Sequence, residues 1–190
     1  FYEKHLSKIK SKKKINILDI GSFSGASAAA FSKYFPNSQI YCLDINLLNF
    51  KFSSKKINVF GMNSSDYKMM TKFLDKIDFF KKINFFDIII DDGSHILSDQ
   101  LNAINFFYKY LGKLSFYIVE DYKLLDHFKH LNDVNDISID VLANYIRDKK
   151  SFTSNIISID TMNDMLRQNK NIYRYKGNSA KSDIIFFQKK

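Results

Sequence analysis

The residues most able to do chemistry are four carboxylates and one imidazole that follow two apolar runs: Asp91, Asp92, His95, Glu120 and Asp121. If residues 86–90 and 114–119 are neighbouring parallel strands, the ends of the two strands lie about 5 Å apart. Carboxylates at that spacing raise one another's pKa unless a cation compensates their charge. The pattern therefore predicts a divalent metal site with a titratable group beside it.

A second chemical pattern begins at Asp19 and runs through a turn of small residues to Ser27. An apolar strand at residues 15–20 precedes the turn, and a helix that ends near residue 35 follows it. The next expected strand, residues 39–43, ends at Asp44. This order is typical of the nucleotide-binding half of a doubly wound fold, in which the acid accepts hydrogen bonds from ribose hydroxyls.

The spacing of the glycines indicates which cofactor the turn suits. A dinucleotide-binding turn needs Gly-x-Gly-x-x-Gly, and its second and third glycines would fall on Phe23 and Ala26. The Gly-Lys-Ser/Thr of a phosphate-binding loop is also missing. The remaining pattern, Asp19-x-Gly21-x-x-x-Gly25, is that of class I S-adenosylmethionine-dependent methyltransferases, and a plain strand-to-helix turn is the alternative.

Two further positions bear on the cofactor. Met62 and Asn63 follow the expected strand at residues 57–60 and are candidate contacts to adenine, or else they precede a helix capped at Ser65. Alternation along a strand aims Asp91 and Asp92 to different sides, and we assign Asp91 to the cofactor. The expected cofactor-binding residues are Asp19, Gly21, Ser22, Gly25, Ser27, Asp44, Asn63 and Asp91.

The remaining patterns complete an α/β chain. Helices are expected within residues 1–14 and over 68–80, 98–110, 122–130 and 137–149, and the last strand candidates are 156–159, 172–175 and 184–188. We predict a Rossmann-like three-layer α/β/α sandwich with a mainly parallel seven-stranded sheet and a C-terminal antiparallel hairpin that turns at 177–178. One domain over residues 1–190 fits this length. Because the first residue is Phe1 rather than Met, we expect an upstream segment.

Composition narrows the class of partner. The net charge is +9, but the lysines are scattered in pairs and triplets without an aromatic stacking platform, which favours a solvated surface over a nucleic-acid groove. No apolar run is long enough to span a membrane, and no signal peptide opens the chain. The single cysteine favours a reducing compartment, so we expect a cytoplasmic protein. Surface positions without a role are expected for His5, His127 and His130.

Two segments resemble a known group of enzymes. Residues 90–95, IDDGSH, followed by Asp99-Gln100, and residues 118–121, IVED, resemble the signature and strand end of the macrocin/mycinamicin sugar O-methyltransferases and of related rhamnosyl O-methyltransferase and "cephalosporin hydroxylase" sequences. Residues 21–25, GSFSG, resemble their cofactor loop. The resemblance spans residues 15–121. It departs at residues 61–63, where relatives have Gly-Asp-Gln, and at residues 113–115, where they have Pro-Gly-Gly.

This resemblance implies that Asp92, Glu120 and Asp121 hold Mg²⁺ and that His95 is the catalytic base. It further implies O-methylation of a hydroxyl on a sugar or glycoside, with a small-molecule or glycan acceptor, and it leaves a homo-oligomer open. One alternative is a Rossmann-like S-adenosylmethionine-binding module without turnover, which the retention of all four residues opposes. The other is an RNA methyltransferase, whose usual Asn-Pro-Pro-Tyr-type or cysteine-based site after the fourth strand is missing from this chain.

Overall fold

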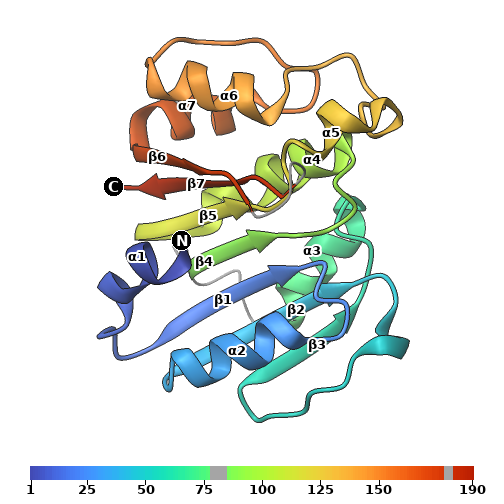
Figure 1. The fold of residues 1–190 in the computed structure, drawn as a ribbon, viewed down its shortest axis with the longest axis vertical. Helices are drawn as coiled ribbons and strands as arrows, with labels where there is room; N and C mark the ends of the chain where they lie inside the picture. Colours follow the sequence, from blue (N-terminus) through green and yellow to red (C-terminus); the bar gives the residue numbers. More distant parts are fainter. Residues whose placement is uncertain (78–84, 178–181) are drawn as a thin grey trace.

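The computed structural model describes residues 1–77, 85–177 and 182–190. Within them one seven-stranded sheet has the order β3-β2-β1-β4-β5-β7-β6 (Figure 1). Its strands are β1 Ile15–Ile20, β2 Ser38–Asp44, β3 Ile57–Gly61, β4 Phe86–Asp91, β5 Leu111–Val119, β6 Asn169–Tyr175 and β7 Ile184–Lys189. Strands β1 to β5 pair in parallel, whereas β7 is antiparallel to both β5 and β6. The predicted mainly parallel sheet with a C-terminal antiparallel hairpin is confirmed.

Helices cover both faces of the sheet, with α1 and α2 on one side and α3 and α4 on the other (Figure 1). The helices are α1 Tyr2–Leu6, α2 Ala26–Tyr34, α3 Tyr67–Lys76, α4 Leu97–Phe107, α5 Leu124–His127, α6 Ile139–Arg147 and α7 Ile159–Gln168. Side chains alternate between the faces of a strand. Accordingly Leu18 and Ile89 join a core with α3 and α4, while Ile17 and Ile88 join a second core with α1 and α2. The predicted three-layer sandwich is confirmed.

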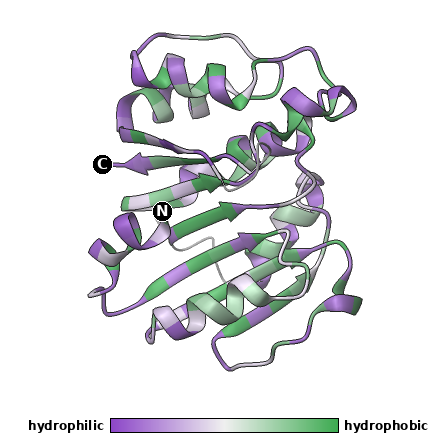
Figure 2. Ribbon diagram, in the orientation of Figure 1, coloured by the Kyte–Doolittle hydropathy of each residue, from purple (hydrophilic) through white to green (hydrophobic). Residues whose placement is uncertain are grey.

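The middle of the sheet is apolar, and the predicted site residues lie at or just beyond the strand ends. Strands β1, β4 and β5 are hydrophobic along most of their length (Figure 2), as expected for parallel strands covered on both faces. The chain leaves β1 toward β2 on one side and later returns as β4 on the other side of β1. A crevice opens at such a switch point, outside the carboxyl ends of the strands, and ligands of open α/β sheets bind there.

The expected strand at residues 156–159 is wrong. The structure has a loop at residues 156–158 and begins α7 at Ile159, where Ser158 caps the helix by accepting a hydrogen bond from the Thr161 N–H at 3.2 Å. The isoleucines of this stretch resemble a buried strand, but Met162, Met165 and Leu166 continue at helical spacing and pack against the core. A serine before such a run is a helix start signal that outweighs the β-branched residues.

Other boundaries shift by a few residues. The helix expected within residues 1–14 is α1 followed by a 3-10 turn at Ser7–Ile9, and the one expected over 122–130 shortens to α5 with a 3-10 turn at Lys129–Leu131. Of the helix expected over 68–80, residues 78–80 lie outside the described residues. Residue 178 of the expected hairpin turn also lies outside them.

The expectation of a surface position for His5 is wrong, whereas His127 and His130 are exposed as predicted. His5 is 2% exposed, and its ring lies 4.2 Å from that of Tyr173 and 5.0 Å from that of Phe186, measured between centroids. Its Nε2 is hydrogen-bonded to the Tyr175 hydroxyl at 2.6 Å. His5 therefore packs α1 onto the hairpin of β6 and β7.

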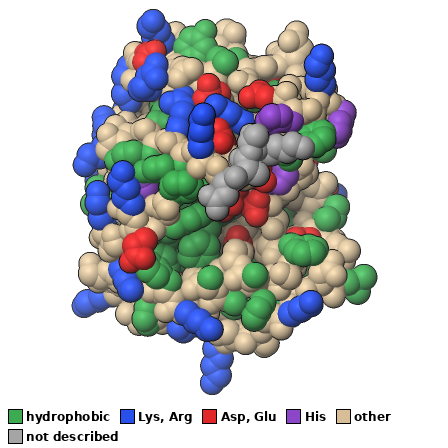
Figure 3. Space-filling model, viewed as in Figure 1, with side chains coloured by type: hydrophobic (Ala, Val, Ile, Leu, Met, Phe, Trp, Pro, Cys, Tyr) green, Lys and Arg blue, Asp and Glu red, His purple; other side chains and the backbone are tan. Residues whose placement is uncertain are grey.

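The surface carries dispersed charge. Basic side chains are spread over the face seen in Figure 3, and acidic side chains and a histidine lie close together near its middle. Some of the lysines are paired, as in the contact of Lys12 Nζ with Asp87 Oδ1 at 2.6 Å. No helix in the described parts of the chain is long and apolar enough to span a lipid bilayer.

Candidate active site at the carboxyl edge of the sheet

The acidic residues converge because β4 and β5 are parallel neighbours, as predicted. The pairing aligns Ile20 of β1 with Asp91 of β4, and Asp91 with Val119 of β5. The ladders extend one residue further, since the Asp92 N–H donates to the Ile20 carbonyl at 3.0 Å and the Glu120 N–H donates to the Asp91 carbonyl at 2.9 Å. These hydrogen bonds fix the backbone just beyond each strand, so the residues that follow β4 and β5 lie at the same edge of the sheet.

Three of the predicted residues form a compact group. Ligand atoms of Asp92, His95 and Asp121 all lie within 4.8 Å of one another, and His95 Nε2 is 3.9 Å from Asp92 Oδ1. Glu120 lies outside this group, and its Oε1 accepts a hydrogen bond from the Tyr2 hydroxyl. Burial and then Glu120 raise the pKa of Tyr2 well above its ordinary value, so this phenol remains a donor.

Burial, together with neighbouring charge, disfavours the ionised form of the carboxyl groups at this edge. Burial, followed by the charges of Glu120 and Asp121, raises the pKa of Asp92 to about 8. Burial is also the main cause of the raised pKa of Glu120 and of Asp121. Three carboxylates held above their usual pKa values favour a compensating cation. Oxygen donors of this kind suit a hard divalent ion, so the residues fit the metal that the sequence predicts.

His95 has the properties of a base beside this group. It lies on the loop between β4 and α4 with a φ of +59°, which turns its half-buried ring toward the acidic residues. Burial lowers the pKa of His95 below its usual value, although the charge of Asp121 and the Glu120 backbone oppose the shift. Its Nδ1 is buried and has no partner among the described residues. The imidazole is therefore neutral near pH 7, which is the form that accepts a proton.

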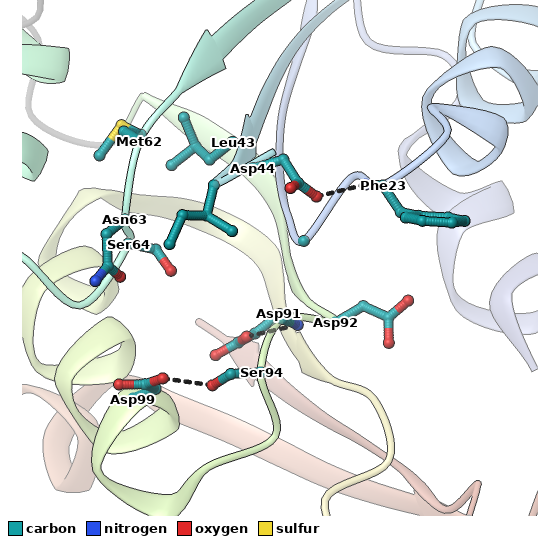
Figure 4. A pocket seen from close by; sticks show the side chains of 13 residues that line it. Phe23, Leu43, Asp44, Met62, Asn63, Ser64, Asp91, Asp92, Ser94 and Asp99 are labelled. Carbon is teal, nitrogen blue, oxygen red and sulfur yellow. Dashed lines mark hydrogen bonds between the residues drawn. The ribbon is translucent and has the colours of Figure 1, made fainter. Parts of the chain in front are cut away.

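A cavity of about 370 Å³ adjoins the acidic residues (Figure 4). Met62 and Asn63, after β3, line one part of it, and Asp91 and Asp92 line another. Asp44, at the end of β2, also lies on its wall. Gly21, after β1, lies on the wall as well, so the cavity joins the ends of four strands at the switch point of the sheet.

The predicted cofactor-binding residues divide into two sets. Four line the cavity: Gly21, Asp44, Asn63 and Asp91. The other four, Asp19, Ser22, Gly25 and Ser27, are not among its lining residues.

Residues of the second set stabilise the turn between β1 and α2. The Ser27 hydroxyl donates to Asp19 Oδ2 at 2.7 Å, and the Ser22 hydroxyl donates to the Asp19 carbonyl at 2.7 Å. Burial raises the pKa of Asp19 to about 6. Gly25 is the N-cap of α2, with a φ of +79°, and lies against the ring of Phe50. A direct contact of these residues with a cofactor stays a prediction.

Two carboxylates on the cavity wall can accept further hydrogen bonds. Asp44 accepts the Phe23 N–H at Oδ2, at 2.7 Å, and the Asn46 N–H at Oδ1, at 2.8 Å, which leaves a lone pair on each oxygen. Asp91 is 4% exposed, and its Oδ2 has no partner among the described residues. Burial raises the pKa of Asp91 to about 7. A ligand with hydroxyl or ammonium donors would satisfy both groups.

Sequence reasoning missed two residues at this edge. Asp99, in the first turn of α4, lines the cavity and accepts a hydrogen bond from the Ser94 hydroxyl (Figure 4). It also accepts one from the Ser65 hydroxyl. Its presence in the resemblance beside the IDDGSH segment was a usable signal. Tyr2 reaches Glu120 across 118 positions of sequence, and no local pattern indicates such a contact.

We expect Gly21→Ala to destabilise the fold and weaken ligand binding at the cavity. Gly21 has a φ of +81°, which costs other residues about 1–2 kcal/mol, and an added Cβ would lie 2.1 Å from the Asp92 carbonyl oxygen. The approach of the backbone at the end of β4 is therefore sufficient to require this glycine. Chemical denaturation measures the loss, with Gly61→Ala as the control because its Cβ would meet only the flexible Leu47 side chain. Equal stability of the two variants would contradict the prediction.

Comparison with known proteins supports the predicted resemblance. No protein-family profile matches the chain. It is 28% identical over 131 residues to L-olivosyl-oleandolide 3-O-methyltransferase of Streptomyces antibioticus, which covers 63% of this chain and 31% of that protein. It is 27% identical over 127 residues to mycinamicin VI 2''-O-methyltransferase of Micromonospora griseorubida, which covers 63% of this chain and 30% of that protein. The chain thus spans about a third of the length of these curated relatives.

Solved structures match over nearly the whole chain. The MycE methyltransferase from the mycinamycin biosynthetic pathway, in complex with Mg, SAH and mycinamycin VI, has a TM-score of 0.71 at 20% identity and covers 99% of this chain and 47% of its own. A putative hemolysin from Lactococcus lactis has a TM-score of 0.56 at 16% identity, over 99% of this chain and 85% of its own. Because proteins with different names share this fold, the fold by itself does not determine the function. The chain has a methyltransferase-like α/β fold and resembles sugar O-methyltransferases in sequence.

Proposed function

We propose that this protein is a Mg²⁺-dependent O-methyltransferase that uses S-adenosylmethionine and acts on a hydroxyl of a sugar or glycoside. The observation that carries the proposal is the group of Asp92, His95 and Asp121 beside a ligand-sized cavity at the switch point of the sheet. The names of the two curated relatives, both sugar O-methyltransferases, support the choice of acceptor.

In this proposal the cavity holds the cofactor. Asp44 accepts hydrogen bonds from the ribose hydroxyls, and its existing bonds to two backbone amides hold the carboxylate in place. Met62 and Asn63 contact the adenine end. The unpartnered Oδ2 of Asp91 accepts a bond from the amino group of the methionine end, because an ammonium is a donor without an acceptor. The methyl group then lies toward Asp92.

The metal-binding residues in this proposal are Asp92, Glu120 and Asp121. Asp92 and Asp121 already lie in one compact group, and Glu120 is the charged neighbour that raises the pKa of Asp92 most. Mg²⁺ at these oxygens would supply positive charge beside the acceptor hydroxyl and favour its deprotonated form, while S-adenosylmethionine would supply the methyl group on a cationic sulfur. The same charge would relieve the repulsion among the three carboxylates.

His95 acts as the general base. A sugar hydroxyl is a weak acid, so its proton must be removed as its oxygen takes the methyl group. The Nε2 of His95 faces Asp92, whereas Nδ1 is buried, so Nε2 takes the proton. The imidazolium that forms is stabilised by the neighbouring Asp92 and Asp121 carboxylates, and its proton then passes to solvent.

Incubation of the purified protein with S-adenosylmethionine, Mg²⁺ and a panel of glycosides with free hydroxyls tests the function. We expect S-adenosylhomocysteine to form and one glycoside to gain the mass of a methyl group. Binding of S-adenosylhomocysteine is measured separately by calorimetry. Binding without transfer to any glycoside would favour the alternative of a module without turnover, and tight binding of NAD without a response to S-adenosylmethionine would overturn the cofactor assignment.

Asp44→Ala is expected to weaken the binding of S-adenosylhomocysteine by about 1–3 kcal/mol, as for the loss of hydrogen bonds to a partly buried polar group. The variant also frees the Phe23 and Asn46 N–H groups that Asp44 now holds. Calorimetry measures the difference, with Asp75→Ala on the exposed side of α3 as the control. Equal affinity of wild type and Asp44→Ala would exclude a ribose contact at this position.

A further inference from the structure

We propose that Tyr2 is a positioning residue of the metal site, and that its hydroxyl holds the Glu120 carboxylate beside Asp92. The inference rests on the proposed function, because it needs a divalent cation at these carboxylates. It assigns a role to the segment before β1, which contains none of the catalytic, cofactor-binding or metal-binding residues that the sequence predicts.

The contact itself is direct. The Tyr2 hydroxyl donates to Glu120 Oε1 from α1, a helix that lies on the face of the sheet also covered by α2. The Glu120 backbone is fixed independently, because its N–H donates to the Asp91 carbonyl at 2.9 Å. The Glu120 side chain is therefore held at both of its ends.

The Tyr2 ring is fixed by its aromatic neighbours. Its centroid lies 5.7 Å from that of Phe31 on α2 and 5.5 Å from that of Phe186 on β7, with interplanar angles of 62° and 66°. Edge-to-face pairs of this kind are favourable, and Phe186 is fully buried. With the ring anchored to two elements of the core, the hydroxyl has little freedom to leave Glu120.

The hydrogen bond suits Glu120 as a metal ligand. The phenol bonds to Oε1, so among the described residues it leaves Oε2 available to a cation. A neutral donor bound to a carboxylate favours the charged form, which is the form that binds a metal. Residues that hydrogen-bond to metal-ligating groups orient them, and their loss typically costs about 10–100-fold in metal affinity.

The variant Tyr2→Phe tests the inference. The affinity of the intact protein for Mn²⁺ is measured by calorimetry or electron paramagnetic resonance. The variant keeps the ring and its contacts with Phe31 and Phe186, and removes only the hydroxyl. We expect Mn²⁺ to bind about 10–100-fold more weakly while the affinity for S-adenosylhomocysteine stays unchanged. Tyr34→Phe is the matched control, because it removes a hydroxyl bonded at 3.4 Å to the carboxylate of Glu3, away from the site.

A double-mutant cycle shows whether Tyr2 acts through Glu120. In a Glu120→Ala background the phenol has lost its acceptor, so Tyr2→Phe is expected to have no further effect on Mn²⁺ affinity. An additional loss in that background would mean that Tyr2 acts through general stability, and the inference would fall. Unchanged or tighter Mn²⁺ binding to Tyr2→Phe would also overturn it. A wild-type protein that binds no Mn²⁺ would instead refute the proposed metal site itself.

Discussion

Removal of divalent cations with EDTA is expected to abolish methyl transfer, and added Mg²⁺ or Mn²⁺ is expected to restore it. The reason is the charge at the ends of β4 and β5, where burial and mutual repulsion raise the pKa values of Asp92, Glu120 and Asp121. Without a cation, nothing among these groups offsets the negative charge of a deprotonated acceptor hydroxyl. When a divalent cation is bound, the three carboxylates hold its positive charge beside the acceptor hydroxyl, which favours deprotonation of that hydroxyl.

Isosteric variants show whether the carboxylates bind the cation. Asp92→Asn and Asp121→Asn keep the side-chain shape but remove the charge, and each is expected to weaken Mn²⁺ binding at least about 10-fold. Asp66→Asn is the control, because Asp66 caps α3 on the exposed surface. Full turnover after exhaustive chelation, together with unchanged Mn²⁺ affinity of the variants, would mean that the acids serve only in hydrogen bonding.

Much of the fold follows from local patterns. The five parallel strands are short apolar runs bounded by glycines, lysines and acids, and such runs indicate buried strands. Because parallel strands end at one edge, the acids after β4 and β5 had to meet once those strands were neighbours. For the same reason Asp44 and Asp91 could be predicted to lie at a common edge.

The misses arise where tertiary contacts decide. Residues 156–159 have a strand-like composition, yet Ser158 caps a helix whose apolar face packs on the core. His5 carries no signal of burial, since its partners Tyr173 and Tyr175 lie about 170 positions away. Gly21 was predicted as a cofactor-binding residue, and the close approach of the Asp92 backbone is a separate reason for glycine there that no local pattern indicates.

The candidate site combines two parts of the chain: the N-terminal strands, which carry the predicted cofactor-binding residues, and the later strands, which carry the acidic residues. Strands β1, β2 and β3 supply Gly21, Asp44 and Asn63, whereas β4 and β5 supply the carboxylates. The switch point lies between these halves, because β1 pairs with β2 on one side and with β4 on the other. A methyl donor in the first half and an acceptor at the second would therefore meet at Asp92.

His95→Ala is expected to lower kcat by about 10²–10⁴-fold, the usual range for a positioned proton acceptor. Its ring is half-buried beside Asp92 and Asp121, and burial keeps it neutral near pH 7. The variant removes the base without touching the cavity wall near Asp44. The affinity for S-adenosylhomocysteine is therefore expected to stay nearly unchanged, so the effect falls on kcat alone.

The comparison of His95→Ala with other variants separates the base from the metal site. Glu120→Ala is expected to lose metal dependence and rate together, whereas His95→Ala keeps its response to Mg²⁺ at a lower rate. His130→Ala is the matched control, because His130 is exposed. Steady-state kinetics on an acceptor found in the glycoside panel provides the measurement. If His95→Ala retained the wild-type kcat, the base assignment would be wrong, and the metal ion alone would have to account for activation of the hydroxyl.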